Sequence, residues 1–152
     1  MEIRDLTKEA VLISEDSTFR DAIALMVSKK TNSLLVIDDD GKLSGEVNVS
    51  DLLNAIVPEY GDPETIIQEL GTEEGFGKSV RETEEKPVSE FMTVDIQPVH
   101  VDDSLLTIAS TAITQETQHI PIVDHDDRPI GVISRRGLKH ILAKYLDIRD
   151  NP

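Results

Sequence analysis

Two short stretches of the chain contain residue types that bind phosphate or calcium in other proteins. Residues 75–79 read Gly-Phe-Gly-Lys-Ser and so end in the Gly-Lys-Ser of a P-loop. A P-loop also needs a glycine five positions before Gly77, where Thr72 stands, and an apolar strand leading into it. Residues 38–41, Asp-Asp-Asp-Gly, match part of a calcium loop, but Val47 stands where that loop requires glutamate. Neither stretch predicts a phosphate or calcium site.

Side chains for catalysis and for transition metals form no pattern in the sequence. The absence of cysteine excludes disulfides, zinc–thiolate sites and cysteine nucleophiles. The four histidines lack the paired helical spacing with a carboxylate that zinc sites use, and no Ser/His/Asp arrangement is recognisable. We therefore expect a protein that is not an enzyme, requires no cofactor and holds no metal.

The charge balance restricts the partners. Thirty acidic residues against fifteen basic ones give a formal charge of −15, which disfavours binding to nucleic acid or to an anionic membrane. The N-terminus lacks the pattern of a signal peptide, and no apolar stretch approaches the roughly 18 residues of a membrane span. We expect a cytoplasmic protein with no membrane span, whose core is aliphatic because only five aromatic residues are present.

The chain contains the same pattern twice. Shifting residues 11–57 by 86 positions places them on residues 97–143 without a gap. Asp38 then coincides with Asp124 and Gly45 with Gly131, and the apolar positions repeat throughout. Such a repeat predicts two units of one fold.

Each copy predicts a strand, a helix, a strand that is apolar on both faces, a second strand after a hairpin turn, and a closing helix. Residues 16–18 and 102–104 supply polar side chains that cap the first helix of each copy. The expected elements are 11–13, 19–26, 33–37, 43–47 and 50–56 in the first copy, and 98–101, 105–112, 119–123, 130–133 and 136–146 in the second. We expect an α/β (α+β) fold of two β-α-β-β-α units packed as a pseudo-twofold pair.

The segment between the copies is rich in glutamate, glycine and proline. We expect the boundaries 1–57 for the first unit, 58–90 for an acidic linker or insert, and 91–152 for the second unit. Ile66, Ile67 and Leu70 can form one short helix, whereas residues 72–85 are expected to form a solvated loop.

Both copies resemble CBS domains, the family named after cystathionine β-synthase. The resemblance lies in residues 33–38 and 45–53, in residues 119–124 and 131–138, and in Phe91-Met92-Thr93, which matches the family's hydrophobic–Met–Thr start. It implies a pair of units that share a cleft, assemble as a dimer and regulate other proteins by binding AMP, ATP, S-adenosylmethionine or a related ligand.

The resemblance also assigns the ligand site, because a Gly–apolar–apolar–Thr/Ser–x–x–Asp segment faces ribose and phosphate in the family. The first copy keeps the carboxylate as Asp51 but has Asn48 where Thr or Ser is usual. The second copy keeps Ser134 but has Gly137 where the ribose acceptor would stand. We therefore predict one competent site around Asp51 and a weaker or empty one around Gly137.

The remaining residues that the resemblance assigns to the Asp51 site come from both copies. They are Ser50 and Asn32 from the first copy, and Val99, Gln118, His119, Ser134, Arg135 and Arg136 from the second. Three cationic side chains favour a phosphorylated ligand, AMP or ATP, over uncharged adenosine.

Simpler roles remain open for these residues. Asp51 can cap the helix that follows it, Arg135 and Arg136 can be solvated charges, and His119 can be a structural histidine beside a strand. The alternative function is a ligand-free scaffold whose acidic 58–90 arm docks a partner. A homodimer is expected because apolar helix faces, around Ala22, Met26, Ile108 and Ala112, need cover; a regulated effector protein is the other expected partner.

Overall fold

The computed structural model describes residues 6–57, 64, 67–68, 71–115 and 119–149, which fold into two compact units. The first-repeat unit comprises Val11–Asp39 and Ser44–Val94, and the second-repeat unit comprises Met1–Ala10, Asp40–Leu43 and Asp95–Pro152. Both mix helices with a three-stranded sheet, which confirms the α/β class. In the parts of the chain described, every helix is too short or too polar to cross a membrane.

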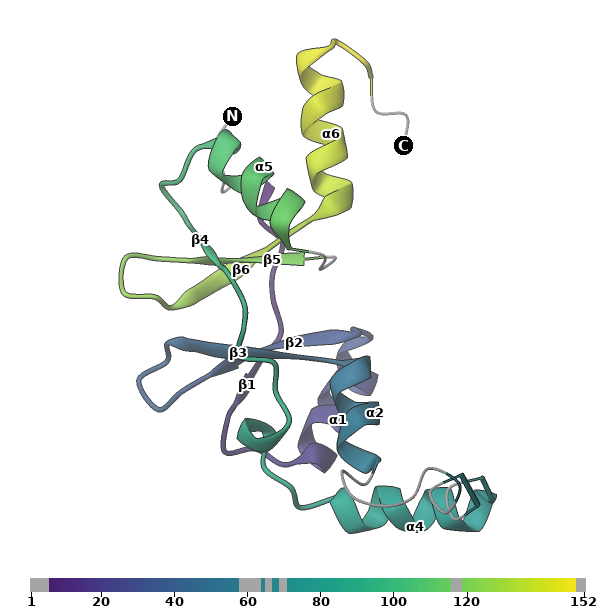
Figure 1. The fold of residues 1–152 in the computed structure, drawn as a ribbon. Helices are drawn as coiled ribbons and strands as arrows, with labels where there is room; N and C mark the ends of the chain where they lie inside the picture. Colours follow the sequence, from purple (N-terminus) through teal and green to yellow (C-terminus); the bar gives the residue numbers. More distant parts are fainter. Residues whose placement is uncertain (1–5, 58–63, 65–66, 69–70, 116–118, 150–152) are drawn as a thin grey trace. The chain divides into compact units, whose positions relative to one another are not determined.

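The first-repeat unit has the expected order of elements. They are β1 (Leu12–Ser14), α1 (Phe19–Lys29), β2 (Ser33–Ile37), β3 (Leu43–Asn48) and α2 (Val49–Ile56). The sheet order is β1-β2-β3, with β1 parallel to β2, and Figure 1 shows α1 and α2 on the same face of this sheet.

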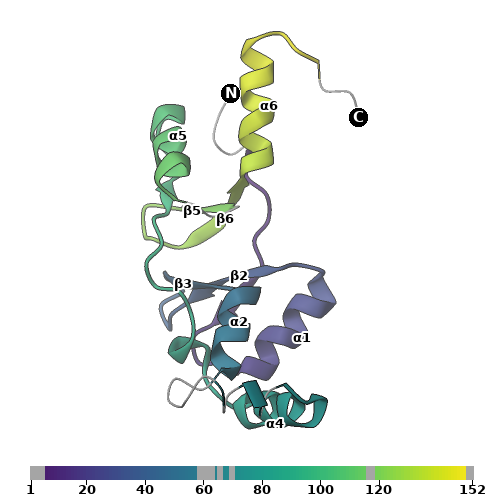
Figure 2. The same ribbon diagram turned by 45° about the vertical axis from the view of Figure 1, so that its right-hand side comes forward.

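The second-repeat unit repeats this arrangement. Its elements are β4 (Val99–His100), α5 (Leu105–Thr114), β5 (His119–Val123), β6 (Pro129–Ser134) and α6 (Arg135–Tyr145). Strand β4 is parallel to β5, and β5 is antiparallel to β6. Figure 2 shows α5 and α6 on one side of this sheet. The strand–helix–strand–strand–helix order is therefore confirmed in both copies. The element ends lie within two residues of those expected, except that α1 continues three residues further, to Lys29.

Each unit has its own aliphatic core. In the first-repeat unit Ala22, Leu34, Val36 and Val47 are at most 1% exposed, and in the second-repeat unit Ile108 and its neighbours fill the same places. The predicted apolar helix face of α1, at Phe19, Ala22, Ile23 and Met26, is the face that packs on the sheet.

The segment in front of each repeat pairs with the sheet of the other repeat. Lys8 exchanges two backbone hydrogen bonds with Val132 on β6 (2.8 and 2.9 Å), and Thr93 exchanges two with Glu46 on β3 (2.8 and 2.9 Å). A glycine stands just before each of the two paired strand residues: Gly45 before Glu46, and Gly131 before Val132. A side chain at Gly45 would not fit, because its Cβ would lie 2.8 Å from the Met92 sulfur and 2.9 Å from the Thr93 carbonyl oxygen. Each compact unit therefore includes the segment that precedes the other repeat in the sequence.

Residues 72–85 differ from the expected solvated loop. They form α4 (Glu73–Thr83), which Thr72 caps by accepting a hydrogen bond from the Gly75 amide (3.0 Å). Thr83 is buried, Val80 packs against the core of the first-repeat unit, and a short 3₁₀ turn, Val88–Glu90, follows. The expectation of a loop was wrong because a segment with few apolar residues can still form a helix when it packs on a unit that is already folded. The predicted helix around Ile66 and Leu70 lies largely outside the described residues.

Candidate functional site

The start of α2 holds the predicted ribose acceptor. Asn48 is the N-cap, and its Oδ1 accepts a hydrogen bond from the Asp51 amide at 2.9 Å. The Asp51 Oδ2 accepts in return from the Asn48 amide at 2.9 Å, so the two residues form a capping box. The simpler role of Asp51 as a helix cap is therefore present. Because its Oδ1 is the capping atom, Asn48 keeps its Nδ2 amino group as a donor for other partners.

Thr93 fixes the other oxygen of Asp51. Its hydroxyl donates a hydrogen bond of 2.8 Å to Asp51 Oδ1, across 42 positions of sequence. The same residue pairs with Glu46 through its backbone, so the leading segment of the second repeat helps to build the first-repeat site. Sequence reasoning marked Thr93 only as part of a family pattern and gave it no role. A carboxylate with one donor on each oxygen is held in a single orientation and still has room to accept further hydrogen bonds.

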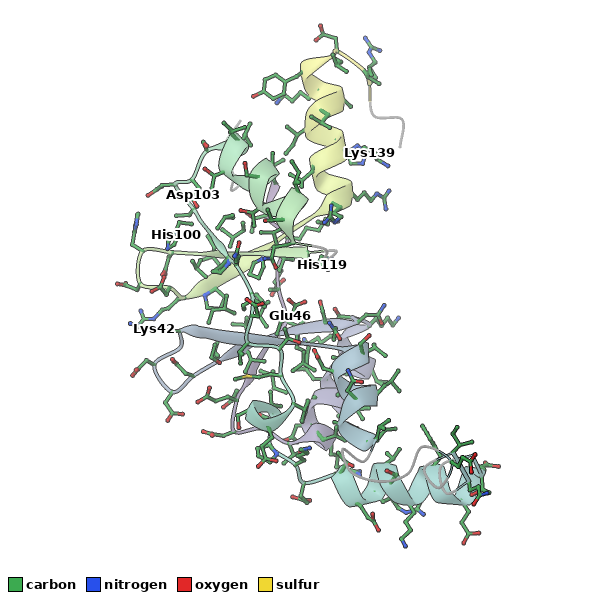
Figure 3. All side chains as sticks on the ribbon, viewed as in Figure 1. Lys42, Glu46, His100, Asp103, His119 and Lys139 are labelled. Atoms are coloured by element: carbon green, nitrogen blue, oxygen red, sulfur yellow. The ribbon has the colours of Figure 1, made fainter. Side chains whose placement is uncertain are left out.

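Glu46 is a second carboxyl group that sequence reasoning did not select. It lies on β3 (Figure 3), is 7% exposed, and points to the face opposite its core-packed neighbour Val47, since side chains alternate along a strand. Burial raises the pKa of Glu46 above its usual range, and the negative charge of Asp51 raises it further. The signal in the sequence was a charged residue in the middle of an apolar strand.

Two more predicted residues lie in the first-repeat unit. Ser50 is exposed on the first turn of α2. Asn32 is exposed just before β2, where with Lys30, Thr31, Val49 and other residues it lines a hollow of about 430 Å³ between the end of α1 and the start of α2.

The equivalent helix start in the second-repeat unit lacks a carboxylate. Ser134 is the N-cap of α6, and its hydroxyl oxygen accepts a hydrogen bond from the Gly137 amide at 3.0 Å. Because Gly137 has no side chain, nothing at this position returns a bond to the Ser134 amide, and no acceptor stands where Asp51 stands in the other unit.

The other predicted residues of the second-repeat unit have different environments. Val99 is buried in the core, and Arg136 is exposed. Arg135 donates to the carbonyl oxygens of Ala112 (2.7 Å) and Gln115, so its guanidinium caps the C-terminal end of α5. Gln118 lies outside the described residues.

His119 is half-buried at the start of β5 (Figure 3). Burial lowers the pKa of His119 below its usual range, and the positive charge of Lys8 on the leading segment lowers it further. A neutral imidazole carries one donor and one acceptor, so this side chain suits a hydrogen bond more than an ion pair at neutral pH.

The described residues offer donors and acceptors but no metal ligand set. Among them, no group of three or more His, Asp or Glu side chains is placed to hold a metal ion. The groups that are present can form hydrogen bonds to a ligand: carboxylate oxygens accept from hydroxyl groups, and amide, imidazole and guanidinium donors suit phosphate.

The family model of the CBS domain matches residues 3–58 and 88–144. Protein MJ1426 of Methanocaldococcus jannaschii, which is uncharacterized, is 26% identical over 149 residues that cover 91% of this chain and 89% of that protein. Homoserine O-acetyltransferase of Methanosarcina acetivorans is 25% identical over 133 residues, which cover 88% of this chain but only 20% of the enzyme. The chain spans 59% of the length of a further relative, MJ1004 of Methanocaldococcus jannaschii.

Solved structures share the fold. The structure of CBSX2 in complex with AMP has a TM-score of 0.68 at 23% identity and covers 95% of this chain and 98% of that chain. CBSX2 is a CBS-pair protein from Arabidopsis thaliana. At this level of identity the likeness establishes the fold of the two units and not their ligand.

Proposed function

Because the chain belongs to the CBS domain family, we propose that it is a regulatory module, not an enzyme, that binds an adenosine nucleotide through residues of both repeats. AMP or ATP is the favoured ligand. The AMP in the complex of CBSX2 supports this class of ligand, since the fold is the same.

The observation that carries the proposal is the state of the Asp51 carboxylate. Each of its oxygens accepts one hydrogen bond from the protein, Oδ2 from the Asn48 amide and Oδ1 from the Thr93 hydroxyl. An ionised carboxylate has about four acceptor positions, so one remains on each oxygen. Two acceptors held in a fixed orientation suit the two neighbouring hydroxyl groups of a ribose.

In this proposal, residues of the second repeat bind the phosphate group of the nucleotide. Arg136 is exposed, and His119 presents a half-buried imidazole. Arg135 already donates to the end of α5, but a guanidinium has five N–H donors, so it can contribute further bonds. Asn48, Ser50 and Asn32 supply the remaining polar groups near the start of α2 and β2. Ser134, Val99 and Gln118 complete the proposed set from the second repeat.

Titration calorimetry with AMP, ADP, ATP and S-adenosylmethionine tests the proposal. We expect one of them to bind below millimolar concentration with one site per chain, and Asp51→Ala to weaken it at least tenfold, because a lost ribose acceptor is worth about 1–3 kcal/mol. Thr93→Val should weaken binding less, since it frees the carboxylate without removing it.

Asp21→Ala is the matched control. Asp21 forms the same capping box at the start of α1, where its Oδ2 accepts from the Thr18 amide at 3.0 Å. It therefore reproduces the loss of a helix cap without the loss of a proposed ligand contact. If both variants weaken binding equally, Asp51 acts only as a cap; if none of the four compounds binds, the nucleotide proposal is wrong.

The helix faces around Ala22, Met26, Ile108 and Ala112, which the sequence offered for a homodimer, are buried in the core of their own unit, so that reason for a dimer is wrong. Other, exposed apolar side chains support the homodimer as part of this proposal. On α5, Leu106 and Ile113 are 76% and 81% exposed, and on α6 Leu142 and Tyr145 are each 67% exposed. Large apolar side chains exposed on a helix can form part of a protein interface. Analytical ultracentrifugation should give a dimer for the wild-type chain and a monomer for Ile113→Glu; a wild-type monomer at tens of micromolar would contradict it.

A further inference from the structure

Helix α4 is fixed against α1 and α2 at several points. The Ser79 hydroxyl donates to the carbonyl oxygen of Ile56 at the end of α2 (2.6 Å). At the start of α1, the Arg20 amide donates to the Glu84 carbonyl (3.1 Å), and the Arg20 guanidinium pairs with the Glu84 carboxylate at 2.8 Å. Figure 1 shows α4 lying across the ends of these two helices, away from the sheet.

A hollow of about 330 Å³ lies between α1 and α4. Apolar side chains line most of it, and three charged ones complete the lining: Phe19, Ile23, Ala24 and Val80, with Arg20, Arg81 and Glu84. Small-molecule sites occupy roughly 300–1,000 Å³ and combine an apolar surface with a few polar groups, so this hollow has the size and composition of a small site. None of its lining residues belongs to the proposed nucleotide site.

The charges around the hollow are unequal. Arg20 is neutralised by Glu84, whereas Arg81 forms no ion pair among the residues that the structure describes. The Arg81 guanidinium lies against its own helix beside Gly77: a Cβ built at Gly77 would come within 3.2 Å of the Arg81 Nη1. A glycine inside a helix costs about 1 kcal/mol relative to alanine, and here it leaves space for the guanidinium beside the hollow.

We propose that this hollow binds a small amphipathic carboxylate, whose aliphatic body lies against Ile23, Ala24 and Val80 and whose charged group pairs with Arg81. An apolar surface favours the hydrocarbon part, and Arg81, which forms no ion pair with another described residue, selects an anion. Because such a ligand would contact α1 and α4 together, binding should stabilise the docking of α4 on the first-repeat unit.

NMR titration of the isotope-labelled full chain with sodium octanoate tests this proposal. We expect saturable shifts of the backbone amides of Ile23, Ala24 and Val80, and a much weaker response to octan-1-ol, which has the same chain without the charge. Arg81→Gln should weaken octanoate at least tenfold. Ala24→Leu, at an exposed helix position that tolerates a larger side chain, should abolish binding by filling the hollow.

Lys78→Gln is the matched control, since Lys78 lies on the same helix, pairs with Glu82 at 3.8 Å and does not line the hollow. It should bind octanoate like the wild type. The proposal is overturned if millimolar octanoate gives no saturable shift, if Ala24→Leu binds normally, or if Lys78→Gln and Arg81→Gln weaken binding equally. The titration uses no nucleotide, so its outcome is independent of the Asp51 site.

Discussion

The two repeats build the same sheet and the same helix start, but they use the third residue of that helix differently. In the first-repeat unit Asp51 closes a capping box and receives the Thr93 hydroxyl. In the second-repeat unit Gly137 leaves Ser134 as the only cap. The difference shows that this helix start forms with a single capping side chain and without the carboxylate.

The same comparison extends to the strands that lead into these helices. Glu46 and Val132 hold equivalent positions, each paired with the leading segment of the other repeat. The first-repeat unit therefore places a second carboxyl group, Glu46, near Asp51 at the start of α2, whereas the second-repeat unit has an apolar residue at that strand position. The two units have the same backbone fold and differ in the side chains at equivalent positions.

The largest effect is expected at the glycines that admit the leading segments. A Cβ at Gly131 would clash with the Thr7 methyl group and the Lys8 carbonyl oxygen, so Gly131→Ala should lower the free energy of unfolding by about 1–3 kcal/mol. Hydrogen exchange should show the loss of protection at the Val132 amide, which bonds to Lys8, while the Glu46 amide keeps its protection.

Gly45→Ala is the reciprocal variant. It should expose the Glu46 amide and spare Val132, with a smaller loss of stability because one of the atoms it meets is the flexible Met92 sulfur. If either substitution removes protection from both amides, the two leading segments are not independent.

A smaller effect is expected from giving the second repeat the missing carboxylate. Gly137→Asp has room, because a Cβ there would lie 3.4 Å from the Ser134 hydroxyl oxygen. The new side chain can accept from the Ser134 amide, which together with the loss of a helical glycine should stabilise the chain by about 1 kcal/mol. If the asymmetry of the ligand sites rests on this residue, calorimetry should also show a second nucleotide per chain. Gly137→Ala separates the helix effect from the carboxylate effect.

The third comparison concerns Glu46 and its apolar counterpart Val132. Because burial raises its pKa in the folded state, Glu46 favours folding below its unfolded value of about 4.5, and this contribution is lost as the pH rises through the folded pKa. Glu46→Gln stays uncharged, so its stability relative to the wild type should increase from about pH 5 to about pH 7.5. Urea unfolding at the two pH values measures this change, and Glu85→Gln, at an exposed position, controls for the loss of one charge. A pH-independent difference would contradict the assignment.

The smallest effect is expected at His119, which stands where the first repeat has Ser33. Its pKa is lowered in the folded state, so its contribution to stability is complete above the unfolded value of about 6.5 and is lost as the pH falls through the folded pKa. Lys8→Gln removes the second cause and should raise the pKa of His119. NMR titration of the imidazole measures it, and an unchanged value would mean that Lys8 does not influence this side chain.

The sequence alone determined the repeat, the order of elements and the position of most helix starts. These features are local: the alternation of apolar residues, the spacing of Phe19, Ala22 and Met26, and the capping side chains act within a few residues of where they stand. A single chain therefore carries enough information to place them.

Tertiary structure decided the contacts that cross the sequence. Thr93 reaches Asp51 over 42 positions, Lys8 pairs with a strand that follows more than a hundred residues later, and α4 becomes a helix because it packs on α1 and α2. No periodic signal marks such partners, because each depends on how distant segments are brought together. The sequence thus selected Asp51, and the fold determined which groups hold its two oxygens.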